Sequence, residues 1–194
     1  MLERKSPLSR KRVFGKFGNP SQEIGVTIKE IKDFSYLEMA VWDPDSMSLR
    51  SKLSELLTIR DLPRTGKSLP LKGGVLLRVG PDRIAYLGED GPAAILEAAV
   101  AVEEGSVVLL SHSRCYLRLG GPRVRNLLRR GLRIDLNEES FAVGDTAFTE
   151  LHGLGVLLIR RETDQFDLIF MRTTAQNVWH WLTITAAQFG YEVS

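Results

Sequence analysis

The sequence predicts an α+β fold built from two ferredoxin-like βαββαβ units, each with helices covering one face of an antiparallel sheet. Short alternating segments, typical of half-buried strands, are separated by amphipathic helical segments. Each half of the chain has the element order strand, helix, strand, strand, helix, strand, which is the ferredoxin-like order. Local sequence also recurs at an offset of about 80 residues: Tyr-Leu-Glu-Met at 36–39 parallels Tyr-Leu-Arg-Leu at 116–119, and Gly-Val-Leu-Leu recurs at 74–77 and 155–158. These observations favour an internal duplication.

The stretch 113–136 shows the pattern most clearly. Its first part alternates, with Cys115, Leu117 and Leu119 on one side, which predicts a half-buried strand. A Gly-Gly turn follows, and Pro122 opens a short helix, where its missing N–H costs nothing. The apolar stripe of this helix contains Val124, Leu127 and Leu128. We therefore predict a structural role for this stretch, because it contains no nucleophile with a general base beside it.

The other elements follow from the same two periodicities. The expected strands are 26–31, 34–42, 74–79, 83–87, 107–110, 145–151, 155–160 and 166–170. The expected helices span 46–57, 91–104 and 174–189, and a polar connection spans 60–73. We divide the chain into an extended basic arm (1–22), a first half (23–112) and a second half (113–194), with the two halves forming one compact pseudo-duplicated domain.

Composition excludes several classes of protein. The chain has 194 residues, 43% hydrophobic and 26% charged, as expected for a globular protein. The longest nearly apolar run, 93–102, contains Glu97 and is about half as long as a membrane-spanning helix, so we expect no membrane span. The single cysteine, Cys115, permits no internal disulfide, which favours a reducing, cytoplasmic compartment.

The positive charge is concentrated at the start of the chain. Residues 1–18 contain six basic residues and one acidic residue, which leaves 20 basic and 23 acidic residues in the rest. A nucleic-acid-binding domain carries its basic residues on the folded surface. We therefore expect no nucleic-acid partner, although a nucleic-acid-binding protein that uses the basic arm is a rival hypothesis.

No motif predicts a catalytic, cofactor-binding or metal site. Gly-Lys-Ser at 66–68 lacks the earlier glycine of a phosphate-binding loop, and the side chains of Ser-His-Ser at 111–113 diverge on a strand. His152 and His180 have no ligand at metal-binding spacing. We therefore expect no catalytic, cofactor-binding or metal-binding residue on this chain.

The two ends of the chain are the candidate subunit interface. The last helix has an apolar arc wider than one sheet needs, so we assign Val178, Leu182 and Phe189 to the core and expect Trp179 or Trp181 to reach a neighbouring chain. The arm combines charge with apolar residues, as segments that order on a partner do. The interface hypothesis comprises Leu2, Arg4, Leu8, Val13, Phe14, Trp179 and Trp181.

Several of these segments resemble the gamma subunit of heterotetrameric sarcosine oxidase. The resemblance is carried by residues 110–136, Phe-Ala-Val-Gly at 141–144, the strands 155–160 and 166–168, Val-Trp-His-Trp-Leu at 178–182, the opening segment 2–8, and Gly-Pro-Asp at 80–82. It covers most of the chain and is strongest from 106 onward, while 19–70 match poorly.

The resemblance implies a fold similar to the folate-binding domain of glycine-cleavage T-protein, itself a duplicated ferredoxin-like unit. It implies a non-catalytic subunit of a complex with alpha, beta and delta subunits, which oxidatively demethylates sarcosine to glycine, hydrogen peroxide and a one-carbon unit passed to tetrahydrofolate. It places FAD, FMN, NAD, tetrahydrofolate and zinc on the other subunits.

Two alternatives to this function stay open from the sequence. The chain is also compatible with the equivalent subunit of an N-methylglutamate or other secondary-amine dehydrogenase. A free-standing folate-binding aminomethyltransferase-like protein is a rival of another class, but it needs a pocket carboxylate that we do not identify. The amine substrate, the electron acceptor, any retained folate affinity and the faces that contact partners are not determined by this sequence.

Overall fold

The computed structural model describes residues 5–18 and 23–194 and divides the chain into two compact units. Unit 1 comprises the chain up to Lys32 and from His112 to Ser194, whereas unit 2 comprises Asp33–Ser111. Each unit has its own sheet and its own apolar core. The later boundary between the units falls between Ser111 and His112. Residues 23–32, however, belong to unit 1 and not to the predicted first half.

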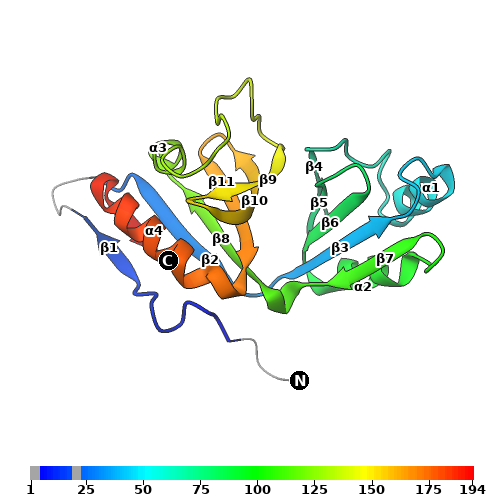
Figure 1. Cartoon of the computed structure of the whole chain (residues 1–194), viewed down its shortest axis with the longest axis horizontal. Helices are drawn as coiled ribbons and strands as arrows, with labels where there is room; N and C mark the ends of the chain where they lie inside the picture. The colour runs from blue at the N-terminus through cyan, green and yellow to red at the C-terminus, as the bar shows by residue number, and fades with distance from the viewer. Residues whose placement is uncertain (1–4, 19–22) are drawn as a thin grey trace. The chain divides into compact units, whose positions relative to one another are not determined.

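Unit 2 is a ferredoxin-like unit with one added strand (Figure 1). Its elements are β3 (Ser35–Val41), α1 (Met47–Leu56), β4 (Ser68–Leu71), β5 (Gly74–Arg78), β6 (Arg83–Gly88), α2 (Asp90–Ala99) and β7 (Gly105–Leu109). The sheet order is β4-β5-β6-β3-β7 and all its pairs are antiparallel. Leu53 from α1 and Leu96 from α2 pack with Leu37, Leu76 and Tyr86 in one core, so both helices cover the same face.

Unit 1 repeats this plan and extends it. Its elements are β1 (Gly15–Phe17), β2 (Val26–Ile31), β8 (Arg114–Gly120), α3 (Val124–Leu128), β9 (Thr146–Leu151), β10 (Leu154–Glu162), β11 (Gln165–Met171), α4 (Ala175–Ala186) and β12 (Tyr191–Val193). The sheet order is β1-β12-β2-β8-β11-β10-β9. Figure 1 shows α4 lying across β2 and β8, and residues of α3 and α4 join the core on that face.

The predicted duplication is confirmed by the topology. The repeated sequence at 36–39 and 116–119 lies in β3 and β8, the first strands of the two repeats, and the repeat at 74–77 and 155–158 lies in β5 and β10. The two units differ at one place. In unit 2 the last strand, β7, pairs directly with β3, whereas in unit 1 β2 lies between β8 and β12.

Three short strands were missed by the sequence analysis. β4 lies within the predicted connection 60–73 and contains Pro70, which an edge strand tolerates because one side of its backbone is unpaired. β1 and β12 are each three residues long, too short for an alternating pattern to be visible.

Residues 5–18 pack onto unit 1 and do not form an extended arm. Leu8 has no accessible surface and belongs to the unit 1 core. Glu30 follows Val26 and Ile28 on the core face of β2, where a carboxylate needs partners. Ser6 donates its hydroxyl to Glu30 Oε1 at 2.6 Å, and the Arg12 guanidinium binds the other oxygen. The predicted arm therefore completes one end of the core.

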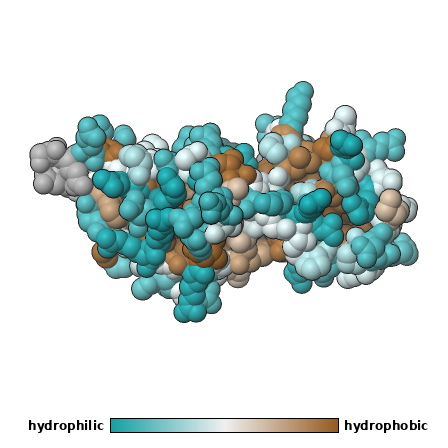
Figure 2. All heavy atoms as spheres, turned by 90° about the horizontal axis from the view of Figure 1, so that it is seen from above, coloured by the Kyte–Doolittle hydropathy of each residue, from teal (hydrophilic) through white to brown (hydrophobic). Residues whose placement is uncertain are grey.

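The surface is mixed in character. Figure 2 shows hydrophilic residues over much of the face in view, with apolar residues between them. The exposed large apolar side chains include Val13, Phe14, Trp42, Ile95, Val102, Phe148 and Ile184. Among the described residues, no helix combines the length and apolarity needed to cross a membrane.

The packing of Leu8 gives a first testable prediction. Leu8→Ala should lower the free energy of unfolding of the full chain by about 2–5 kcal/mol, because it opens a cavity in the core. Val13→Ala, in the same segment but exposed, is the matched control and should stay within about 0.5 kcal/mol. Urea denaturation of both variants measures the difference. Equal stability of the two variants would show that residues 5–18 do not contribute to the fold.

Candidate functional site

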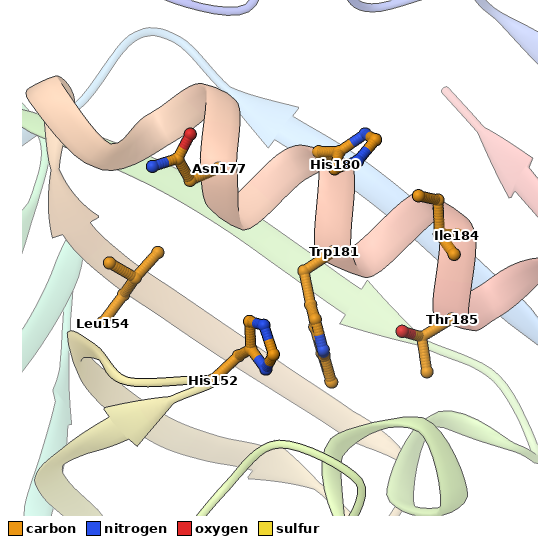
Figure 3. Close-up of a pocket in the computed structure, with 7 residues that line it drawn as sticks. All are labelled: His152, Leu154, Asn177, His180, Trp181, Ile184 and Thr185. Atoms are coloured by element: carbon orange, nitrogen blue, oxygen red, sulfur yellow. The ribbon is translucent and has the colours of Figure 1, made fainter.

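The candidate site is a pocket of about 450 Å³ on unit 1 (Figure 3). One side is the β9–β10 hairpin and the other is α4. The lining residues are His152, Leu154, Asn177, His180, Trp181, Ile184 and Thr185. In Figure 3 the rings of His152 and Trp181 lie side by side between the hairpin and the helix.

His152 is positioned by a tight hairpin turn. The turn has only two residues, His152 and Gly153, with φ of 50° and 78°. Two residues with positive φ match the twist of the flanking strands, but this conformation is unfavourable for a side chain other than glycine. The His152 N–H donates to Gly131 O at 2.9 Å, which ties the turn to the segment after α3. The hairpin tip is thus held in place despite the unfavourable φ.

Trp181 is positioned by contacts with His152 and Gly131. It stacks on His152 with the ring centroids 5.8 Å apart and the planes at 23°. It also approaches Gly131 so closely that a Cβ there would lie 2.5 Å from Trp181 Cζ2. Glycine at 131 therefore makes room for the indole, and the aromatic pair is preorganised.

The pocket combines apolar walls with a few polar groups. Its lining has aromatic and aliphatic side chains, two imidazoles, one amide and one hydroxyl, and no carboxylate, thiol, amine or guanidinium. Ligand pockets commonly combine apolar walls with a few polar groups in this way. The sequence does not predict that His152 and His180 line the same pocket, because they are far apart in the chain. Within residues 5–18 and 23–194, no three potential metal-binding side chains form a cluster.

A second polar group on unit 1 lies within the sheet. Asp167 is fully buried and lies directly across from Arg118 in the register of β11 and β8. Arg118 Nε donates to Asp167 Oδ1 at 2.7 Å, and the Tyr116 hydroxyl donates to Oδ2 at 2.6 Å. Arg161 Nε approaches Oδ2 at 3.6 Å. Asp167 was not identified in the sequence, where it reads as one polar residue in an apolar strand. The arrangement stabilises a buried carboxylate, as a structural network does.

The predicted interface residues fall into three groups. Leu8 and Trp179 are buried in the unit 1 core, so neither reaches a neighbouring chain, and the prediction is wrong for both. Val13, Phe14 and the partly exposed Trp181 have accessible surface. Leu2 and Arg4 lie outside the described residues.

The helix α4 explains this division. Val178 and Leu182 are buried as predicted, and Phe189, just after the helix, is partly buried against the same core. Trp179 lies beside them on the face toward the core, whereas Trp181 lines the pocket. The wide apolar arc of the helix therefore serves a core and a surface pocket.

Comparison with known proteins gives consistent matches. A sequence model of the sarcosine oxidase, gamma subunit family matches residues 89–188. The sarcosine oxidase subunit gamma of Corynebacterium sp. (strain U-96) is 30% identical over 121 residues, which is 61% of this chain and 59% of that relative. The chain thus matches less than two thirds of that relative's length.

Two solved structures resemble the fold. A chain of heterotetrameric sarcosine oxidase from Corynebacterium sp. U-96, solved with pyrrole 2-carboxylate, aligns with a TM-score of 0.76 and 25% identity over 84% of this chain and 85% of that one. The glycine cleavage system aminomethyltransferase T from Bartonella henselae aligns with a TM-score of 0.63 and 17% identity over 89% of this chain and 48% of that one. The second match shows shared fold alone.

The fold defines a class, a duplicated ferredoxin-like α+β protein that shares its fold with aminomethyltransferase T and has a pocket on one unit. Within that class, the family match is decisive, because residues 89–188 are more than half of the chain and contain both α2 and α4. The chain belongs to the sarcosine oxidase gamma subunit family.

The contact between Gly131 and Trp181 gives a second prediction. Gly131→Ala should displace the indole, change the tryptophan emission spectrum and lower the free energy of unfolding by about 1–3 kcal/mol through overpacking. Gly155→Ala in β10 is the control, because a Cβ there meets no atom within 4 Å. An unchanged spectrum in Gly131→Ala would contradict the positioning role of Gly131.

The buried hydroxyl of Tyr116 gives a third prediction. Burial, together with the Asp167 charge, raises the pKa of Tyr116 above its ordinary value of about 10. Folding therefore favours the neutral form of Tyr116. The stability linked to this shift is fully present below the pKa of Tyr116 in the unfolded chain, and it is lost as the pH rises through the pKa of Tyr116 in the folded chain.

Tyr116→Phe tests this linkage by unfolding measurements between pH 8 and about 11, across the ordinary tyrosine pKa. The wild-type chain should lose more stability than the variant as the pH rises. The reason is that Tyr116 ionises at lower pH in the unfolded chain, which stabilises the unfolded state relative to the folded state. Parallel stability curves for the two proteins would show that Tyr116 does not carry the effect.

Proposed function

We propose that this chain is the gamma subunit of a heterotetrameric sarcosine oxidase. The complex would contain alpha, beta and delta subunits and demethylate sarcosine oxidatively to glycine, hydrogen peroxide and a one-carbon unit passed to tetrahydrofolate. The observation that carries the proposal is the likeness to a chain of heterotetrameric sarcosine oxidase over 84% of this chain. The family match over residues 89–188 supports it independently.

On this proposal the chain is non-catalytic and acts through assembly. The pocket has no carboxylate or thiol in its lining, and the buried Asp167 is engaged by Tyr116 and Arg118. FAD, FMN, NAD, tetrahydrofolate and zinc would all be held by the other subunits, in a cytoplasmic complex. Purified alone, the chain should then be colourless and retain no flavin. Stoichiometric flavin absorbance would contradict this role.

Co-expression with the other subunits tests the proposal as a whole. The purified complex should oxidise sarcosine only when all four chains are present. An equivalent subunit of an N-methylglutamate or other secondary-amine dehydrogenase is the alternative, so both amines are assayed. Activity on N-methylglutamate but not on sarcosine would favour that alternative over a sarcosine oxidase. Folate binding by the isolated chain would instead favour a free-standing aminomethyltransferase-like role.

We further propose that the pocket contacts another subunit, with Trp181 and Ile184 as its apolar contact residues. Trp181 is already ordered by His152 and Gly131, so little conformational entropy is lost when a partner covers it. Val13 and Phe14 are kept as further interface candidates, since both are exposed on the segment that packs onto unit 1.

A charge placed in this pocket gives the fourth prediction. Ile184→Asp should fold normally, because the residue is exposed, yet weaken binding to the other subunits by about 2 kcal/mol or more. Ile95→Asp on α2 is the matched control, an isoleucine on a helix that is 52% exposed against 61% for Ile184. Trp179→Ala should instead destabilise the isolated chain by about 3–5 kcal/mol as a core residue. Normal assembly of Ile184→Asp would contradict the pocket's role.

A further inference from the structure

An exposed tryptophan of unit 2 is held rigidly at the surface. Trp42 directly follows β3 and is 59% exposed. Its indole N–H donates to Val102 O at 2.8 Å, and its backbone N–H donates to Glu104 O at 3.0 Å. A large side chain whose indole is fixed by a hydrogen bond, on a backbone that is itself hydrogen-bonded, loses little conformational freedom on binding. Such a residue is suited to an interface.

The turn beneath Trp42 is itself well ordered. Glu104 N–H and Gly105 N–H both donate to Ala101 O, at 2.9 and 3.1 Å. The Glu104 carboxylate accepts from Ala101 N–H at 3.0 Å and pairs with Lys52 Nζ at 2.8 Å. This turn holds Val102, 76% exposed, beside the indole. We call Trp42 and Val102 together the Trp42 platform.

Acidic residues adjoin the platform in the chain. Asp43 and Asp45 follow Trp42, and Glu103 follows Val102, and all three are exposed. Asp43 Oδ1 accepts from the Asp45 N–H at 3.0 Å, which orders this turn. In the part of the chain that the structure describes, none of the three forms an ion pair. Their charges are therefore available to a cationic partner.

We infer that the Trp42 platform docks another subunit of the complex through an apolar hollow rimmed by lysine or arginine. This inference rests on the proposed function, which supplies the partner subunits. Charge complementarity selects a basic rim, since like charges across an interface are unfavourable. For the same reason a symmetric contact between two copies of this chain is disfavoured, because it would oppose acidic residues to acidic residues.

The test measures binding of the chain to the immobilised complex of the other subunits. Trp42→Ala should raise the Kd at least about tenfold, as loss of an interface tryptophan does. Phe148→Ala, an exposed aromatic residue on unit 1, is the control and should change the Kd less than about threefold. Val102→Asp is the second variant, and its high exposure leaves folding intact. Unfolding midpoints confirm that each variant is folded.

The acidic rim is tested by Asp43→Asn combined with Glu103→Gln. This variant should slow association and flatten the dependence of the Kd on salt, as expected for complementary charges. If the wild-type chain fails to bind the other subunits, the proposed function fails and this inference fails with it. If the wild-type chain binds and the Trp42 and Val102 variants bind equally well, only this inference is overturned. A dimer of the isolated chain that Trp42→Ala dissociates would overturn it in favour of self-association.

Discussion

Insertion of β2 into the unit 1 sheet, between β8 and β12, is the constraint on which the rest of unit 1 depends. β2 precedes β8 by more than 80 residues in sequence, yet it pairs antiparallel with β8 and parallel with β12. It thereby separates the first and last strands of the repeat, which are adjacent in unit 2. The long-range pairing also brings the N-terminal segment to the sheet, where β1 pairs with β12.

Two buried carboxylates show how this sheet tolerates charge. Glu30 lies at the end of the core face of β2 and is compensated by Ser6 and Arg12. Asp167 lies in the middle of β11 and is compensated by Arg118 and Tyr116 across the neighbouring strand. A buried charge is stabilised only when its partners are in place, so each carboxylate specifies one arrangement of distant segments. The folding of residues 5–18 onto unit 1 follows from the first of these pairs.

The two candidate binding surfaces share one physical property. In the pocket, Trp181 contacts His152 and Gly131, and on unit 2, Trp42 is held by the turn before β7. Each presents a large, ordered apolar ring at the surface, which is the kind of group that contributes most to subunit association. Through such surfaces the chain would contribute to the proposed complex by assembly.

The sequence by itself determined the α+β class, the duplication, the α-helices and all but three short strands, because alternation and helical periodicity are local properties, as in Cys115 to Leu119. It could not determine that β2 joins the later sheet, that Leu8 and Trp179 are core residues, or that His152 and Trp181 share a pocket. Those depend on pairing between segments far apart in the chain. The sequence shows that a side chain is apolar, but only the tertiary structure decides whether it packs in the core or lies at the surface.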